Sequence, residues 1–351
     1  MNIQQAIKNM TKNIHLTEPQ MKDVMYSIMQ GETTNAQIGA FLMGLRLKGE
    51  TIEEITAAAQ VMRELAIHVK PEHTEHLVDI VGTGGDGQNL FNVSTAASFV
   101  ISSASATVAK HGNRGVSSNS GSSDLLEKAG IHLDLSISQT ERCLNEMGIG
   151  FLFAPNHHKA MKYAIAPRKE LGIRTIFNLL GPLTNPAGVQ RLVVGVFSEE
   201  LCVPIAEVLK NLGAIHVMVV HSQDGLDEIS LATKTTVAEL KNGEVTTWQI
   251  HPEHVGIQAQ ALNGLSVESS QDSLKLIKDA LGRKKSEIGH KAADIIALNA
   301  GAGIYVAGLA KDYAQGVAFA QDIIDGGQAL EKLSVFAEYT KTLKLVDPTT
   351  E

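Results

Sequence analysis

The sequence predicts an α/β fold in which a small all-helical domain precedes a larger domain with a mostly parallel central sheet flanked by helices. Three observations support this. Residues 1–70 show only helical patterns, strands and helices alternate from Leu77 onward, and 351 residues suffice for one large and one small domain. We place the domains at 1–72 and 73–351, with part of 168–191 completing the first.

The helical domain shows three helix-start signals, each a threonine with Gln or Glu three positions later, at Thr17, Thr34 and Thr51. Apolar residues follow each threonine on one face of the predicted helix, and Gly31 and Gly49 end the first two helices. Methionine-rich stripes on these helices are typical of a core or a subunit interface. Three or four helices of this size form a small domain that needs a partner surface, so we expect a homodimer formed through it.

The remaining elements follow in order as a βα pattern. Strands are predicted at 77–81, 106–109, 149–154, 192–197 and 217–220, and helices after 92–95 and at 122–129, 138–147 and 200–212. A hairpin at Asn242-Gly243 joins strands 236–240 and 245–250 at the sheet edge. The tail predicts helices at 273–281 and 290–300, with a break at 301–303. The turn-rich segment 168–191 predicts a crossing between domains, which places Arg168 beside the cleft.

Composition excludes several classes of protein. A net charge of −8 argues against a nucleic-acid binder, which normally has a basic face. Cys143 and Cys202 lie far apart without metal-ligand spacing, which indicates structural thiols in a reducing compartment. The start of the chain has no apolar signal region and no window reaches transmembrane length, so we expect a cytoplasmic protein without a membrane partner.

The first candidate site is the turn after strand 77–81, which has four glycines in the six positions 82–87. Glycine permits positive φ and brings bare N–H groups to a ligand, and the helix that starts near Ser94 and Thr95 adds its dipole. Strand, glycine turn and helix N-terminus together favour phosphate binding, although a plain connecting turn is an equal alternative for this motif alone. Asp86 inside the turn indicates a metal ion or a sugar hydroxyl nearby.

A second phosphate-binding candidate follows the next strand, at Lys110–Ser122. Lys110 and Arg114 can neutralise phosphate, and hydroxyls, amides and N–H groups of the loop can surround its oxygens. The alternative is a solvated basic turn before a serine-capped helix. Parallel strands bring both loops to the edge where α/β sheets bind ligands, so a ligand with two separate phosphate groups is predicted.

The turn Asp224–Glu228 belongs at the same edge, and its adjacent carboxylates with phosphates nearby are typical of Mg²⁺ binding. Ser94 can add a hydroxyl ligand; the alternative is an acidic solvated turn. Arg168 can clamp a carboxylate. His111 and His158 could relay a proton, whereas a structural role is favoured for His157.

Five motifs stand in the order and spacing of the anthranilate phosphoribosyltransferase family: GTGGDG (82–87), NVST (92–95), KHGNRGVSSNSGSSD (110–124), FNLLGPLTNP (177–186) and DGLDE (224–228). LNAGAGIYVAG (298–308) adds to the resemblance, which covers nearly the whole chain. The family is similar in fold to pyrimidine nucleoside phosphorylases. The resemblance implies a homodimer that uses Mg²⁺ to transfer phosphoribose from phosphoribosyl diphosphate to the amine of anthranilate, in tryptophan biosynthesis.

The resemblance also implies site residues. Phosphoribosyl diphosphate would be held by Gly82, Gly85, Asp86, Leu90, Asn92, Val93, Ser94, Thr95, Lys110, His111, Gly112, Asn113, Arg114, Gly115, Val116, Ser117, Ser118 and Ser122. Anthranilate would meet Gly82, Asn113, Pro155, His158, Arg168 and Gly181. Magnesium, as two ions per subunit, would be held by Ser94, Asp227 and Glu228. No catalytic residue is assigned, with His111 and His158 as the candidates.

The chain departs from the family pattern at three positions. Leu90 stands where threonine is usual and offers a phosphate only its backbone N–H; Asn119 replaces a lysine, and Lys159 a common proline. A pyrimidine nucleoside phosphorylase is the nearest alternative, but it needs no paired metal carboxylates. A non-catalytic nucleic-acid-binding relative would require a basic face, and a nicotinamide-dependent oxidoreductase fits the glycine pattern badly.

Overall fold

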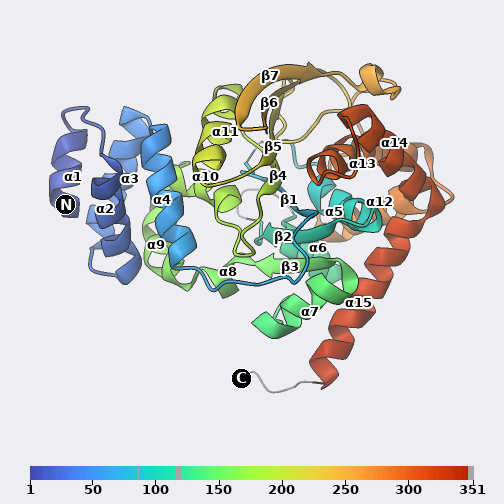
Figure 1. The fold of residues 1–351 in the computed structure, drawn as a ribbon, viewed down its shortest axis with the longest axis horizontal. Coiled ribbons are helices and arrows are strands. Elements are labelled where there is room, and N and C mark those ends of the chain that lie inside the picture. The colour runs from blue at the N-terminus through green and yellow to red at the C-terminus, as the bar shows by residue number, and fades with distance from the viewer. Residues whose placement is uncertain (86, 116–119, 347–351) are drawn as a thin grey trace.

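The structure is a computed structural model that describes residues 1–85, 87–115 and 120–346. Its first four helices are α1 (Ile3–Met10), α2 (Glu18–Gln30), α3 (Asn35–Lys48) and α4 (Ile52–Glu64). They gather at one end of the molecule (Figure 1). The predicted starts are correct: the Thr34 and Thr51 hydroxyls accept the N–H groups of Gln37 and Glu54 at 3.3 and 3.1 Å. Gly31 ends α2 with φ of 77°.

A seven-stranded sheet forms the centre of the described chain, in the order β3-β2-β1-β4-β5-β6-β7. Its strands are β1 (Leu77–Gly82), β2 (Thr107–Gly112), β3 (Ile149–Phe153), β4 (Arg191–Gly195), β5 (His216–Ser222), β6 (Thr235–Lys241) and β7 (Glu244–Ile250). The first five run parallel, whereas β6 and β7 are antiparallel additions at one edge. The predicted Asn242-Gly243 hairpin joins these two, with φ of 54° and 80° at its two residues.

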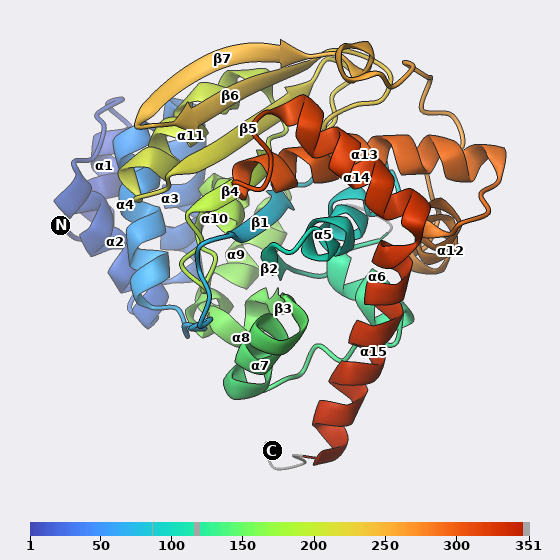
Figure 2. The same cartoon turned by 45° about the vertical axis from the view of Figure 1, so that its right-hand side comes forward.

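Helices cover both faces of the sheet, as a mostly parallel sheet requires. The remaining helices are α5 (Val93–Ser103), α6 (Ser122–Lys128), α7 (Ile137–Met147), α8 (Ala154–His157), α9 (Lys162–Leu171), α10 (Ile176–Leu183), α11 (Cys202–Asn211), α12 (Ser270–Leu281), α13 (Glu287–Val306), α14 (Tyr313–Gly326) and α15 (Gln328–Val346). Short 3₁₀ turns are η1 (Lys159–Met161), η2 (Glu199–Leu201) and η3 (Pro252–Val255). Figure 2 shows α5 and α12–α15 together on one side of the sheet.

Alternate side chains of each strand enter two different cores. On β4, Val193 belongs to the core beneath α5, α13 and α14, whereas Leu192 and Val194 belong to the core shared with α10 and α11. That second core continues into the helical region, because α4 packs against α10 and α11 and α9 packs against α2 and α3. The first four helices are thus joined to the sheet by continuous apolar packing.

The turn-rich segment 168–191 contains the end of α9 and all of α10, with Pro167 inside α9 and Pro182 in the last turn of α10. One prediction about local structure is wrong. Gly301 and Gly303 do not break the tail helix, because α13 runs through both. A Cβ at Gly301 would lie 2.6 Å from Val317 of α14, and one at Gly303 would lie 2.2 Å from Ile101 of α5. These glycines permit close helix packing.

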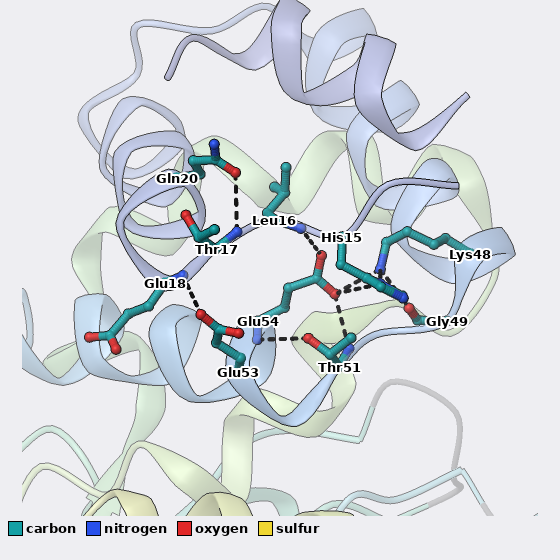
Figure 3. A network of polar contacts seen from close by, with 10 residues as sticks. All are labelled: His15, Leu16, Thr17, Glu18, Gln20, Lys48, Gly49, Thr51, Glu53 and Glu54. Carbon is teal, nitrogen blue, oxygen red and sulfur yellow. Dashed lines mark hydrogen bonds and ion pairs between the residues drawn. The ribbon is translucent and has the colours of Figure 1, made fainter. Parts of the chain in front are cut away.

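One buried carboxylate fixes the loops of the helical region (Figure 3). Glu54 accepts the N–H of Leu16 at 2.8 Å, the N–H of Thr51 at 2.9 Å and the ammonium of Lys48 at 2.7 Å. The side chains of Lys48 and Glu54 are 1% and 0% exposed. Glu54 of α4 therefore joins the loop before α2, the end of α3 and the loop before α4 through one ion pair and its hydrogen bonds.

Both cysteines are free and buried. Within the described ranges, none of the helices has the length and apolar character needed to span a membrane.

Candidate active site

The site forms where the strand order reverses. The chain passes from β1 outward to β2 and β3, then returns to the other side of β1 to form β4. Such a switch point leaves a crevice beyond the carboxyl ends of the two central strands, and α/β proteins bind ligands there. Here those ends are Gly82 of β1 and Gly195 of β4, which are paired in register.

The acidic turn after β5 fills the space that these two glycines leave. A Cβ at Gly195 would lie 1.6 Å from the carbonyl oxygen of Asp227, and one at Gly82 would lie 2.4 Å from its Oδ2. Any larger side chain at either strand end would displace the turn. The sequence DGLDE therefore lies directly against the glycine turn, as the strand order predicts.

Backbone N–H groups of the glycine turn and of α5 point at this acidic pair. The Gly84 N–H donates to Asp227 Oδ2 at 2.7 Å, and the Ser94 N–H at the start of α5 donates to Glu228 Oε1 at 3.2 Å. Gly84 and Gly85 have φ of 68° and 79°. The N–H groups that sequence analysis assigns to an anion are thus directed at negative groups, which demonstrates their capacity for anion binding.

The second predicted loop begins at the end of the neighbouring strand. Gly112 ends β2, and a Cβ there would lie 2.4 Å from the Ser122 hydroxyl. Asp124 of α6 closes the loop, since its Oδ2 accepts the N–H groups of Gly115 and Gly121, both at 3.0 Å. The Asn113 carbonyl accepts the Ser122 hydroxyl at 3.2 Å. Both predicted loops therefore reach the same edge of the sheet, side by side.

Arg114 is exposed and held by carboxylates of the helix that follows its loop. Its guanidinium forms two 2.8 Å bonds to Glu127 and one of 3.2 Å to Asp124. These partners raise the pKa of Arg114, with the hydrogen bond to Glu127 as the main cause. To contact a phosphate, Arg114 would have to exchange these exposed ion pairs, which are individually weak.

Asn92 connects the second loop to α12. Its amide donates to the Ser120 carbonyl at 3.0 Å, and its Oδ1 accepts the hydroxyls of Ser120 and Ser273, both at 2.7 Å. Its backbone N–H also donates to the Ser273 hydroxyl at 3.0 Å. The Asn92 side chain is used to hold the second loop, so it affects a ligand by positioning that loop.

Lys110 lies beneath the site, not at its surface. It is 4% exposed, and its Nζ donates to the Ile80 carbonyl at 2.6 Å. Burial lowers the pKa of Lys110, and the nearby charges of Asp79, Glu228 and Asp227 oppose that shift. The ammonium therefore lies close enough to the acidic pair to interact with it electrostatically from below.

Asp79 is a fully buried carboxyl group that sequence analysis did not assign to the site. It accepts the His111 N–H at 3.3 Å and the Asn185 amide at 2.8 Å, and Asn185 also donates to the Ala109 carbonyl. Burial raises the pKa of Asp79 to about 6. The available signal was an acidic residue within the apolar strand LVDIV. Asp79 fixes the ends of β1 and β2 relative to each other and to the segment after α10.

Two histidines form a buried pair between β2 and the start of η1. The rings of His111 and His158 lie 5.2 Å apart, and His111 Nδ1 is 3.2 Å from the Gly181 carbonyl of α10. Burial lowers the pKa of His111 to about 3 and that of His158 to about 4, so both are neutral at physiological pH. Neither Nε2 has a partner among the described residues. His157 instead bonds the Ile67 carbonyl at 2.9 Å, the structural role favoured from sequence.

Arg168 lies on α9 and faces α10. Its guanidinium carbon is 5.3 Å from the centre of the Phe177 ring. Burial lowers the pKa of Arg168. The guanidinium forms neither a hydrogen bond nor an ion pair with another residue of the described ranges, so it keeps its donors for a ligand.

The other predicted residues are placed as follows. Leu90 forms an isolated bridge with Ser266, Val93 and Thr95 are buried in the first turn of α5, Pro155 is exposed on α8, and Gly181 lies in α10. The Thr95 hydroxyl is buried and unpartnered within the described structure. Asp86, Val116, Ser117 and Ser118 lie outside the described residues, as does Asn119.

Two further residues shape the site, Asp224 within the predicted acidic turn and Arg174, which sequence analysis did not assign. Asp224 accepts the hydroxyls of Ser222 and Ser230, the latter at 2.6 Å, and so shapes the acidic turn. Arg174 contacts the glycine turn at the Gly85 carbonyl, 89 positions away in the chain. The Asp224 contacts are local in the sequence, whereas no local pattern predicts the contact of Arg174 with Gly85.

The donor set at the acidic turn suits magnesium. Asp227, Glu228 and the Ser94 hydroxyl offer only oxygen, which is the ligand type that Mg²⁺ prefers. No group of three or more His, Cys, Asp or Glu residues that could hold a metal ion occurs in the described ranges. A carboxylate pair of this kind fits an ion that takes its other ligands from phosphate and water, as Mg²⁺ does.

Comparisons with known proteins agree with this arrangement. Residues 74–330 match the glycosyl transferase family, a/b domain, and residues 4–66 match the glycosyl transferase family, helical bundle domain. The chain is 75% identical over 344 residues to the anthranilate phosphoribosyltransferase of Acinetobacter baumannii, a match that covers 98% of this chain and 99% of that protein.

Solved structures give the same family. The anthranilate phosphoribosyltransferase of Thermus thermophilus matches with a TM-score of 0.89 and 39% identity, over 96% of this chain and 99% of that one. The enzyme from Saccharomyces cerevisiae, solved in complex with PRPP and Mg, matches with a TM-score of 0.87 and 28% identity, over 97% of this chain and 98% of that one. The chain thus belongs to the glycosyl transferase family, and within it to the anthranilate phosphoribosyltransferases.

Proposed function

We propose that this protein transfers the phosphoribosyl group of 5-phosphoribosyl 1-diphosphate to the amine of anthranilate, in tryptophan biosynthesis. The products are N-(5-phosphoribosyl)anthranilate and diphosphate. The observation that carries the proposal is the contact of Asp227 and Glu228 with the N–H groups of Gly84 and Ser94. Carboxylates for a cation and donors for an anion meet there at one switch point, as a doubly phosphorylated, metal-bound substrate requires.

Phosphoribosyl diphosphate would occupy the crevice between the two loops. The N–H groups of residues 82–85, the N-terminus of α5 and the loop from Lys110 to Ser122 would surround its phosphates. Asp227, Glu228 and Ser94 would hold Mg²⁺, as two ions per subunit. When bound, Mg²⁺ supplies positive charge that stabilises the departing diphosphate. Lys110, beneath the acidic pair, adds fixed positive charge to the same region.

Anthranilate would enter beside the His111–His158 pair. Arg168 would bind its carboxylate, with Gly82, Asn113, Pro155, His158 and Gly181 along its path. Holding the amine against the ribose carbon that loses diphosphate makes the attack effectively unimolecular. An aryl amine is uncharged at neutral pH and needs no strong base. The neutral imidazoles of His111 and His158 could accept the proton that the amine releases.

The assembly and location are part of the proposal. We infer a cytoplasmic homodimer formed through the helical domain at 1–72, with 73–351 as the substrate-binding domain. The net charge of −8 supports small-molecule substrates over a nucleic acid.

The decisive assay follows anthranilate fluorescence. We expect it to fall when phosphoribosyl diphosphate and Mg²⁺ are added together and to stay constant when either is omitted. Phosphorolysis of thymidine in place of this reaction would indicate a pyrimidine nucleoside phosphorylase. The variant Asp227→Asn with Glu228→Gln should keep its melting temperature and lose turnover by several orders of magnitude, because the cation loses both carboxylates. Full activity in that variant would contradict the metal assignment.

A further inference from the structure

Arg174 lies between the helical region and the glycine turn. It precedes Thr175, the N-cap residue of α10, and its guanidinium donates to the Gly85 carbonyl. The same guanidinium carbon is 4.3 Å from the centre of the Phe197 ring. Phe197 follows Gly195, the end of β4, so the stacked pair stands at the switch point itself.

The backbone around Arg174 is fixed beside this contact. The Thr175 N–H donates to Asn178 Oδ1 at 3.0 Å, which holds the start of α10. The ring of Phe197 lies within cation–π distance of the guanidinium and restricts its orientation. Arg174 therefore presents its donor to the turn from a rigid support.

The glycine turn needs such support. Gly84, Gly85 and Gly87 all have positive φ, and glycine has the largest choice of backbone conformations in the free chain. Because the peptide group is planar, fixing the Gly85 carbonyl also fixes the orientation of its peptide plane. A free carbonyl facing the crevice would repel a phosphate, whereas the Gly85 carbonyl accepts a hydrogen bond from the Arg174 guanidinium, which adds positive charge nearby.

We propose that Arg174 is a positioning residue for the diphosphate substrate, which it orders by holding the Gly85 carbonyl so that the N–H groups of the glycine turn face the phosphates. This inference rests on the proposed function and adds a residue to it. Arg174 also lines a cavity of about 270 Å³ with Arg46 and Glu50 at the end of α3, so it connects the glycine turn to the helical region.

The test compares four variants in the full-length protein. Arg174→Gln removes the charge and the planar donor, Arg174→Lys keeps a donor without the flat stack, and Phe197→Leu removes the support. Arg46→Gln is the matched control, because Arg46 lines the same cavity without bonding the Gly85 carbonyl. Calorimetry gives the Kd of phosphoribosyl diphosphate with Mg²⁺ in the absence of anthranilate, and steady-state kinetics give the KM of each substrate.

We expect Arg174→Gln to weaken phosphoribosyl diphosphate binding by about tenfold or more, with the KM of anthranilate within about twofold of wild type. The Kd values of Arg174→Lys and Phe197→Leu should lie between those of wild type and Arg174→Gln, and the Kd of Arg46→Gln should match wild type. An unchanged Kd in Arg174→Gln, or an equal rise in both KM values, would overturn the role of Arg174. If wild type binds the diphosphate without consuming anthranilate, the proposed function fails while the Kd comparison still decides the role of Arg174. If wild type binds no phosphoribosyl diphosphate, both proposals fail.

Discussion

Asp227 fits against the sheet because the neighbouring strands β1 and β4 both end in glycine, at Gly82 and Gly195. The sequence predicts the glycine turn and the acidic turn separately, because strand, glycine and helix-cap patterns are local. Their convergence follows from parallel strand order, which the βα alternation also predicts. The direct bond from the Gly84 N–H to Asp227 could not be predicted, since it joins residues 143 positions apart.

The sequence predicted the roles of other residues of the candidate site only in part. Lys110 was assigned to phosphate as a basic loop residue, yet it is the fourth residue of β2 and is buried. Strand boundaries decide which side chains face the sheet interior, and a short apolar run predicts them poorly. Asp79, Arg174 and Asn185 act through contacts with residues far away in the chain. A single sequence does not show which distant residues come together.

Arg168 is the residue we expect to select the acceptor. Replacement by Ala should raise the KM of anthranilate by about tenfold to a hundredfold, because a charge-assisted hydrogen bond to the carboxylate is lost. The KM of phosphoribosyl diphosphate should change much less, and Arg168→Lys should be intermediate. Steady-state kinetics with each substrate varied in turn measure both constants. Lys169→Ala, at the exposed neighbouring position, is the control, and equal effects on the two substrates would contradict the assignment.

The buried histidines make stability depend on pH. Burial holds the pKa of His158 at about 4, below the usual value near 6.5, so the unfolded chain binds a proton first as pH falls. The contribution of neutral His158 to the free energy of unfolding is therefore complete above pH about 6.5, and it is lost as pH falls toward 4. Between pH 6.5 and 4, the free energy of unfolding of His158→Gln should therefore fall by about 3 kcal/mol less than that of the wild type. Urea unfolding at each pH measures this difference. His73→Gln, at an exposed position, should follow the wild-type curve, and a parallel curve for His158→Gln would contradict this interpretation.

At the scale of elements, capping boxes and glycine ends predicted the helical region reliably, because a few neighbouring residues determine them. Gly301 and Gly303 were interpreted wrongly as a break for the opposite reason. Their function depends on α14 and α5, which approach α13 so closely that a Cβ has no room. Pro167 and Pro182 both lie inside helices, which packing against the helical region and the sheet retains.

Glu54 is the residue on which the loops of the helical region depend. Glu54→Ala should destabilise the protein by about 3–5 kcal/mol, because the Lys48 ammonium would remain buried without its partner. The N–H groups of Leu16 and Thr51 would also lose their acceptor. Glu53→Ala, which removes an exposed acceptor for the Glu18 N–H at 2.9 Å, should cost about 1 kcal/mol or less. Chemical denaturation of both variants measures the difference in the free energy of unfolding. Equal losses of stability would contradict the expected cost of leaving Lys48 buried without Glu54.

At the scale of the whole molecule, the two cores divide the sheet by face, and exposed apolar side chains of α3 and α9 lie outside both. On α3, Leu47 is 75% exposed and Met43 lies one turn before it; on the adjoining α9, Ile165 is 57% exposed. Large apolar side chains gathered on neighbouring helices are typical of an interaction surface. The methionines of the predicted helical stripes are instead buried in the core of the chain. The homodimer was predicted from the small size of the helical domain, and this exposed face is where we propose the contact.

Leu47→Glu should convert the proposed dimer to a monomer, because a charge buried against a second copy of the same face has no partner across a two-fold axis. Sedimentation velocity at micromolar concentration measures the change in mass. Val335→Glu on α15, where the wild-type side chain is 47% exposed, should leave the mass of the dimer unchanged. A wild-type protein that sediments as a monomer, or a Leu47→Glu variant that sediments as a dimer, would exclude this face. Since α9 carries Ile165 on this surface and Arg168 toward α10, loss of the dimer should also raise the KM of anthranilate more than that of phosphoribosyl diphosphate.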